Sequence, residues 1–259
     1  MQNNKFVVRF FMTARLAFND FKSKYAGSAL GAVWALAEPI ITVLIYRFVY
    51  SVAFGGSDID GIPYYLWLSA GIAPWFFISD GLYGTAAAFR DYSFLVKKMR
   101  FDKSVLPSVR AMSAMLSHII FLLLVIILCI ANKTFSADRL IYLIIGAAAA
   151  YIFIYSAGRI LALLCAAYKD VLNALGIILN IGFWITPIFW NPKNVSGFAA
   201  LAIKFNPAAG IVGLYRHALL NTDIPPCSDI LYLTAICIIL LLFGRISEKR
   251  YLPDIADKL

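Results

Sequence analysis

Residues 105 to 131 read VLPSVRAMSAMLSHIIFLLLVIILCIA and contain one charged side chain, Arg110. A helix that crosses the ~30 Å hydrocarbon core of a bilayer needs about 20 mainly apolar residues, and this stretch meets that requirement. Working outward on the same criterion predicts an all-α membrane protein with six transmembrane helices. We place them at 31–54, 64–89, 105–131, 140–167, 171–190 and 229–246.

The composition agrees with a single membrane domain over residues 1–259. Hydrophobic residues make up 62% of the chain and charged residues 14%, and the mean hydropathy is +0.80. An ordinary soluble domain is about half apolar and a quarter charged. This composition excludes a disordered chain, a disulfide scaffold and a soluble enzyme, because no stretch between the apolar segments could hold a water-facing catalytic domain.

Lysine and arginine are distributed unevenly along the chain. Most of the 23 lie before residue 31, between residues 90 and 104, and after residue 244. The positive-inside rule therefore predicts that both termini are cytoplasmic. The net charge of +9 is explained by these juxtamembrane cations, so we expect no nucleic-acid partner.

Residues 5–22 form a separate amphipathic element before the first span. Phenylalanines dominate one helical face, and cations flank it. We expect this helix to lie in the membrane plane, with Phe10 and Phe18 in the acyl boundary and Arg15 and Lys22 toward the headgroups. The alternative is an amphipathic helix packed on a protein surface.

The chain lacks the residues for catalysis or metal binding. It contains no Gly-Lys dipeptide, so it has no phosphate-binding P-loop. His118 and His217 are the only histidines and are too far apart in sequence to form a recognisable zinc motif. We therefore expect a protein that is not an enzyme, with no catalytic residue, metal or cofactor of its own.

Four ionisable residues fall inside the predicted spans: Glu38, Arg47, Asp80 and Arg159. A charge at membrane depth costs about 3 kcal/mol on insertion scales, so each needs a partner or a wet cavity. Asp80 and Arg47 could line a hydrated path. Alternatively, these charges pair with each other or with other polar groups and hold helices together.

Aromatic residues are abundant, with 20 Phe, 14 Tyr and 5 Trp. Trp75, Phe76, Phe183 and Trp184 could offer flat surfaces along which sugar rings slide, because each such contact is weak and easily exchanged. The alternative is that most of these rings simply face lipid or fill the core.

The cytoplasmic segment 90–104 combines apolar side chains with cations. A short helix there could insert Phe94, Leu95 and Phe101 into a groove on a cytosolic partner. Its cations would form the rim of that contact: Lys97, Lys98 and Arg100. A headgroup-anchored turn is the alternative interpretation.

The outer segment 191–228 is too long for a turn and too apolar for a simple loop. Asn-Pro at 191, Asn-Pro at 206 and Pro-Pro at 225 divide it into two stretches, each too short to span. We expect two short re-entrant or interfacial helices that form an outer gate.

Several local strings resemble one family of membrane proteins. They are Ser28-Ala-Leu-Gly31, Trp34, Glu38-Pro39, Gly71-Ile-Ala-Pro-Trp-Phe-Phe77, Leu95-Val-Lys-Lys98, Leu106-Pro107, Tyr168-Lys-Asp170, Phe183-Trp-Ile-Thr-Pro-Ile188, Asn206-Pro207 and Tyr215-Arg216. Their order and spacing resemble the membrane subunit of ABC-2 type (type V) polysaccharide exporters, especially O-antigen permeases, with teichoic-acid and capsule permeases as relatives.

This resemblance implies a homodimeric permease that binds two copies of a cytosolic ATPase, which carries the ATP and Mg. The substrate would be an undecaprenyl-linked glycan that enters near residues 5–22. The segment 90–104 would transmit closure of the ATPase. Tyr46, Tyr50, Phe183 and Trp184 would line the glycan channel at the dimer axis.

Three other functions remain open from the sequence. The chain could export a drug or small lipophile, with its aromatic residues forming a hydrophobic pocket. It could be a secondary carrier that uses the four intramembrane charges, although no inverted repeat is visible. A polytopic membrane enzyme is the third alternative, but the chain shows no catalytic constellation.

Overall fold

The computed structural model describes residues 2–28, 31–53, 58–98 and 102–259. All regular elements within these ranges are helices, apart from an isolated bridge between Ile59 and Ile62. The prediction of an all-helical protein is therefore confirmed.

The helices follow one another with short connections. Their bounds are α1 Gln2–Lys24, η1 Gly31–Val33, α2 Trp34–Ala53, α3 Tyr64–Asp91, α4 Ser93–Lys98, α5 Val105–Ala131, η2 Ala137–Arg139, α6 Leu140–Ala167, α7 Asp170–Ile185, η3 Pro192–Asn194, α8 Gly197–Lys204, α9 Pro207–Leu220, α10 Cys227–Tyr251 and η4 Pro253–Lys258.

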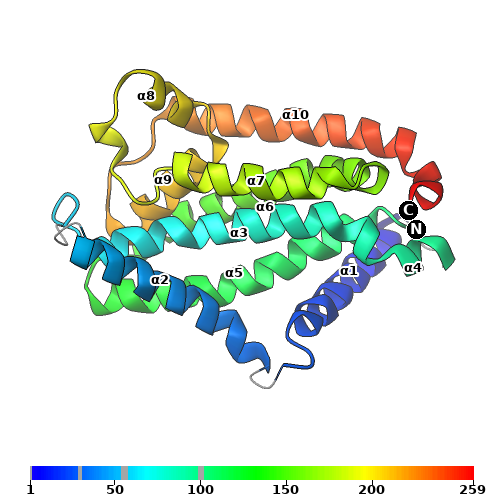
Figure 1. Cartoon of the computed structure of the whole chain (residues 1–259), viewed down its shortest axis with the longest axis horizontal. Coiled ribbons are helices and arrows are strands. Elements are labelled where there is room, and N and C mark those ends of the chain that lie inside the picture. The colour runs from blue at the N-terminus through cyan, green and yellow to red at the C-terminus, as the bar shows by residue number, and fades with distance from the viewer. Residues whose placement is uncertain (1, 29–30, 54–57, 99–101) are drawn as a thin grey trace.

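Helix α3 is the centre of the bundle. It packs against α5, α6 and α9, and most of its side chains are buried. Small residues permit this close approach: a side chain at Gly158 of α6 would collide with Thr85, and one at Gly81 would collide with Ile154. The long helices run side by side along the longest axis of the molecule (Figure 1).

Among the described residues, three helical stretches are long and apolar enough to cross a membrane: α5, η2 with α6, and α10. The expected count of six is thus not reproduced by length and hydropathy alone. Helix α7 is too short because it ends at Ile185 and not at residue 190; Pro187 follows, and its ring nitrogen cannot continue the hydrogen-bonded ladder. Helix α3 contains Asp80 and several small or polar residues, which lowers its mean hydropathy.

Helices α8 and α9 occupy the outer segment and meet at an angle of 81°. This pair is either one broken span or a re-entrant loop, and the latter matches the expectation for residues 191–228. The break has a local cause, because the Asn206 side chain accepts a hydrogen bond from the Ala208 amide and Pro207 occupies the first helical position.

Helix α1 packs along α5 at the end of the bundle that also holds α4 and both chain termini (Figure 1). The 3-10 helix η4 folds back after α10 and contacts α4 and α6. This end of the bundle therefore collects the expected interfacial helix, the expected coupling segment and the C-terminal tail.

Candidate functional site

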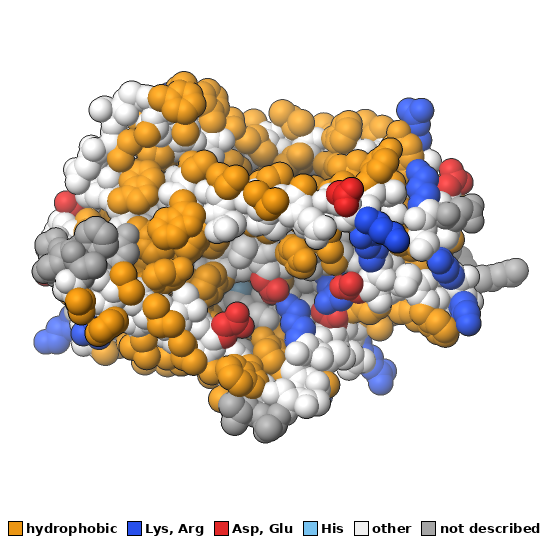
Figure 2. All heavy atoms as spheres, viewed as in Figure 1, with side chains coloured by type: hydrophobic (Ala, Val, Ile, Leu, Met, Phe, Trp, Pro, Cys, Tyr) orange, Lys and Arg blue, Asp and Glu red, His pale blue; other side chains and the backbone are white. Residues whose placement is uncertain are grey.

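A cavity of about 610 Å³ opens between α2 and α7 and is closed behind by α3 and α5. We call it the inner cavity. Figure 2 shows charged side chains gathered in a hollow of an otherwise largely apolar face. Its size lies in the range of small-ligand sites. Phe76, Phe77, Tyr83 and Phe121 contribute apolar walls, so the cavity offers both rings and charges to a ligand.

Lys24 and Asp80 form an ion pair at the mouth of the inner cavity. The Lys24 Nζ lies 2.8 Å from Asp80 Oδ2 and 3.1 Å from Oδ1. Asp80 is half exposed, so it remains within reach of a ligand. The sequence singled out Asp80 but not Lys24, which counted only as one of the cations that set the topology.

The other intramembrane charges have separate surroundings. Glu38 is exposed at the cavity, next to Pro39. Arg47 does not pair with Asp80; its guanidinium lies 4.7 Å from the centre of the Tyr65 ring. Asp80 thus pairs with Lys24 and not with Arg47, which agrees with the alternative in which these charges pair with other polar groups.

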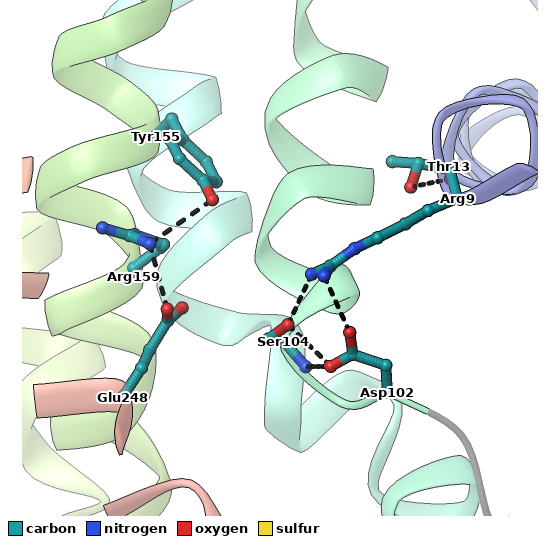
Figure 3. A network of polar contacts seen from close by, with 7 residues as sticks. All are labelled: Arg9, Thr13, Asp102, Ser104, Tyr155, Arg159 and Glu248. Carbon is teal, nitrogen blue, oxygen red and sulfur yellow. Dashed lines mark hydrogen bonds and ion pairs between the residues drawn. The ribbon is translucent and has the colours of Figure 1, made fainter. Parts of the chain in front are cut away.

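Arg159 is buried and serves as a link between α6 and α10 (Figure 3). Its Nη1 donates to Glu248 at 2.9 Å, and its Nη2 donates to the Leu241 carbonyl at 3.1 Å. The guanidinium also lies over the Tyr155 ring. Gly244 leaves the room that this side chain needs. This arrangement matches the structural alternative for Arg159 and places it away from the inner cavity.

His118 forms the back wall of the inner cavity, and its Nε2 lies 2.8 Å from the Tyr215 hydroxyl. Its ring stacks on Phe77 with the centroids 4.5 Å apart. These contacts tie α5 to α3 and α9, which identifies His118 as a packed helix residue. Within the described residues no cluster of three potential metal ligands occurs.

Four of the six predicted channel aromatics meet in one cluster. The ring of Phe183 in α7 lies about 6 Å, between centroids, from Tyr46 of α2 and from Trp75 of α3. Trp184 joins through Phe183 and through Phe189, which contacts three of the rings and also belongs to the aromatic residues that the sequence offers as a sugar surface. The members of this cluster differ in exposure: Trp75 is buried and Trp184 is 58% exposed.

Of the remaining two channel candidates, one lies elsewhere and the other is outside the described side chains. Phe76 stacks on Phe121 and lines the inner cavity instead of joining the aromatic cluster. The Tyr50 side chain lies outside the described part of the structure. The described members of the predicted set therefore divide between the cavity wall and a cluster near the C-terminal end of α7.

The predicted coupling segment contains the short helix α4. Phe94 is 64% exposed, and Lys98 lies over its ring at 4.8 Å. Lys97 is exposed and Leu95 is partly buried, whereas Arg100 and Phe101 lie outside the described residues. The helix thus presents one exposed apolar ring with Lys98 over it and a second exposed cation, Lys97, an arrangement suited to a shallow contact on a partner.

Helix α1 differs in one respect from the expected interfacial helix. Phe10, Phe18, Arg15 and Lys22 are exposed, as a membrane-facing surface requires. Asp20 is a charged residue of the same amphipathic helix, but it is buried against protein. Helical periodicity does not show which polar residues have distant partners.

Asp20 joins three helices at the end of the bundle. Its carboxylate accepts a hydrogen bond from the Tyr92 hydroxyl and pairs with Arg110, which also pairs with Asp91. Burial and the hydrogen bond to Asp20 raise the pKa of Tyr92, so this phenol stays protonated as a donor. Helix α1 is thereby anchored to α3 and α5.

A second link joins α1 to the chain that follows α4 (Figure 3). Arg9 pairs with Asp102 at 3.0 Å and donates to the Ser104 hydroxyl at 2.6 Å. The surface helix and the segment 102–104 are therefore directly connected.

The outer segment encloses a second cavity of about 500 Å³. Arg216 borders it and is buried, with its guanidinium 3.8 Å from the centre of the Trp67 ring. Its Nη1 and Nη2 donate to the Pro187 and Ile188 carbonyls, which no longer have helical partners. Sequence reasoning counted Arg216 only as an outer charge, although the Tyr-Arg pair stood among the quoted strings.

Lys193 links loops at the surface of the outer segment. Its Nζ lies 2.6 Å from Asp223 and 3.7 Å from Asp60, so it joins three loops. The hydrogen bond and charge of Lys193 lower the pKa of Asp223, and the same contacts raise the pKa of Lys193.

Comparison with known proteins connects this architecture to one family. The family model described as ABC-2 type transporter matches residues 13–220, from within α1 to the end of α9. The chain belongs to the ABC-2 type transporter family. This assignment agrees with the resemblance that the local strings carry.

Individual members of the ABC-2 family match over most of their length. The chain is 23% identical over 228 residues to an O-antigen export system permease protein RfbA from Myxococcus xanthus, covering 87% of this chain and 86% of that protein. Two proteins of the same name from Klebsiella pneumoniae match at 23% over 235 residues and at 25% over 205 residues. They cover 90% and 78% of this chain, and 89% and 77% of their own lengths.

Proposed function

We propose that this ABC-2 protein is the permease subunit of an ABC transporter that exports a lipid-linked polysaccharide of the O-antigen kind. The observation that carries the proposal is the match, over most of both chains, to proteins named as O-antigen export permeases. The chain has no P-loop of its own, so a separate ATPase with bound ATP and Mg would supply the energy.

The inner cavity is the proposed site where the glycan headgroup first enters. Hydroxyl groups both donate and accept hydrogen bonds, so a sugar can satisfy Lys24, Asp80 and Glu38 at once. A purely lipophilic drug could not hydrogen-bond to Glu38 or to the half-exposed Asp80, which favours the glycan over the small-lipophile alternative. The exposed phenylalanines of α1 would hold the lipid carrier beside this opening.

We further propose six spans, formed by α2, α3, α5, α6, α7 and α10, with both termini cytoplasmic in a bacterial inner membrane. Helix α3 needs little apolar surface because protein covers most of it. Two copies would face each other through the exposed sides of α2 and α7, which include Leu44, Phe48, Ile181 and Trp184. This homodimer would bind two ATPases, and α8 and α9 would form its outer gate.

Deletion of the gene tests the proposal. We expect undecaprenyl-linked glycan to accumulate on the cytoplasmic side while the surface polymer disappears, and the wild-type gene to restore export. Normal surface polymer in the deletion strain would refute the proposed function.

Complementation with Asp80→Asn tests the inner cavity. We expect surface polymer to fall by about tenfold, since loss of one charged contact of roughly 1.4 kcal/mol corresponds to that factor. The matched control is Asp58→Asn, which changes an exposed carboxylate in the outer loop. Equal export by both variants would remove Asp80 from the path.

A further inference from the structure

The C-terminal tail ends in a buried contact. Helix α10 stops at Tyr251, and Pro253 begins the 3-10 helix η4, which turns back toward the bundle. Ile255 in this short helix is completely buried, although its neighbours Pro253 and Asp254 are exposed. One side chain of the tail is therefore inserted into the protein.

Ile255 belongs to a small hydrophobic cluster at the end of the bundle. The cluster joins Phe89 of α3, Val96 of α4, Leu106 of α5 and Leu163 of α6. Leu252, Ala256 and Leu259 of the tail pack around it. The tail thus completes a core that would otherwise lie open beneath α4.

Helix α4 depends on this cluster for its position. It has only six residues, which is too short to be stable alone, and it packs chiefly against η4 and the end of α3. Val96 faces the tail cluster and is buried, while Phe94, Lys97 and Lys98 point outward and are exposed. The inner side of α4 is held by η4 and its outer side is open to a partner.

The tail is also tied to the transmembrane helices. Helix α10 leads directly into η4, and Glu248 near its end pairs with the buried Arg159 of α6. A displacement of α4 would therefore be passed through η4 to both α10 and α6.

We propose that Ile255 is a positioning residue, and that the C-terminal tail is the support that orients α4 for the ATPase and transmits its movement to α6 and α10. This inference rests on the proposed function, because it takes α4 as the contact with the ATPase.

The test uses the full chain with its own ATPase subunit and compares Ile255→Asp, Ile255→Ala and Ile255→Val. Asp254→Ala, at the exposed neighbouring position, is the matched control. We expect hydrogen exchange at residues 93–98 to rise at least about tenfold in Ile255→Asp and less in Ile255→Ala, as loss of buried support increases local opening. Ile255→Val and Asp254→Ala should keep the wild-type rate.

The amount of ATPase that co-purifies should be lowest with Ile255→Asp, intermediate with Ile255→Ala and equal to wild type with Ile255→Val. The melting temperature separates positioning from general instability. The main core of the bundle, which includes Ile72, Phe121 and Ile154, is a hydrophobic cluster distinct from that of Ile255 and should keep its transition in Ile255→Ala. Unchanged exchange at residues 93–98 in both Ile255→Asp and Ile255→Ala would overturn the inference. Failure of the wild-type chain to bind the ATPase would instead refute the proposed function.

Discussion

Single side chains in this protein join helices that are far apart in sequence. Arg159 and Glu248 form a pair whose side chains are 4% and 15% exposed. Removing one partner of a buried pair leaves an uncompensated charge and costs about 3–5 kcal/mol. We expect Glu248→Gln to lower the thermal stability of the detergent-solubilised protein strongly. The control Lys249→Gln, at an exposed position, should have little effect, and equal melting of the two variants would contradict the role of the pair.

Arg216 has a geometry that lysine cannot reproduce. Its two terminal nitrogens reach two consecutive carbonyls while its plane covers Trp67. We expect Arg216→Lys to increase hydrogen exchange around residues 186–194, with a loss of about 2 kcal/mol in local opening free energy. Lys204→Arg, an exposed substitution in the same segment, is the control. Unchanged hydrogen exchange in Arg216→Lys would show that a single positive charge is sufficient to hold these carbonyls.

The contact between Lys193 and Asp223 is sensitive to pH. The folded state lowers the pKa of Asp223. The ion pair is therefore fully formed at pH values above the ordinary pKa of aspartate, and it is lost as the pH falls through the lowered pKa. We expect the outer loops to become more accessible to protease only in this acidic range. Asp223→Asn should remove the acid-dependent step, and a step that persists in this variant would assign it to another group.

At the scale of elements, α1 acts as a surface helix fixed at defined points. Asp20 provides the buried point of attachment, through Arg110 and Tyr92. We expect Asp20→Asn to raise hydrogen exchange throughout α1 while leaving α5 unchanged, because an amide cannot replace the charged pair. Asn19→Ala, on the exposed side, should leave α1 protected. Protection retained in Asp20→Asn would mean that apolar packing alone holds the helix.

Element boundaries show how far the sequence could predict this fold. The long apolar runs indicated helices where α5 and α6 lie, because lipid-facing segments must be apolar over their whole length. The hydropathy pattern predicted the end of α7 too late, at residue 190. The apolar residues after Pro187 keep the hydropathy high, although the helix has already ended at Ile185. Hydropathy measures burial in lipid or protein and does not measure backbone hydrogen bonding.

At the scale of the whole molecule, the proposed topology places Cys227 on the outer side and Lys97 on the cytoplasmic side. Cys227 is exposed, whereas the other three cysteines are buried. We expect a membrane-impermeant maleimide to label Cys227 in intact spheroplasts. In a Cys227→Ser background, Lys97→Cys should react only in inside-out vesicles. Reaction of both positions from one side would overturn the six-span arrangement.

The sequence by itself determined the class of protein, the helical segments, the absence of a nucleotide-binding loop and the resemblance to ABC-2 permeases, because these follow from local composition and short strings. Only the tertiary structure decided that Asp80 meets Lys24, that Arg159 meets Glu248 and that Ile255 shares a buried cluster with Val96 of α4. Such contacts join residues from distant parts of the chain. Their formation depends on how helices pack around α3, and residue patterns along one helix do not specify which neighbour a given face will meet.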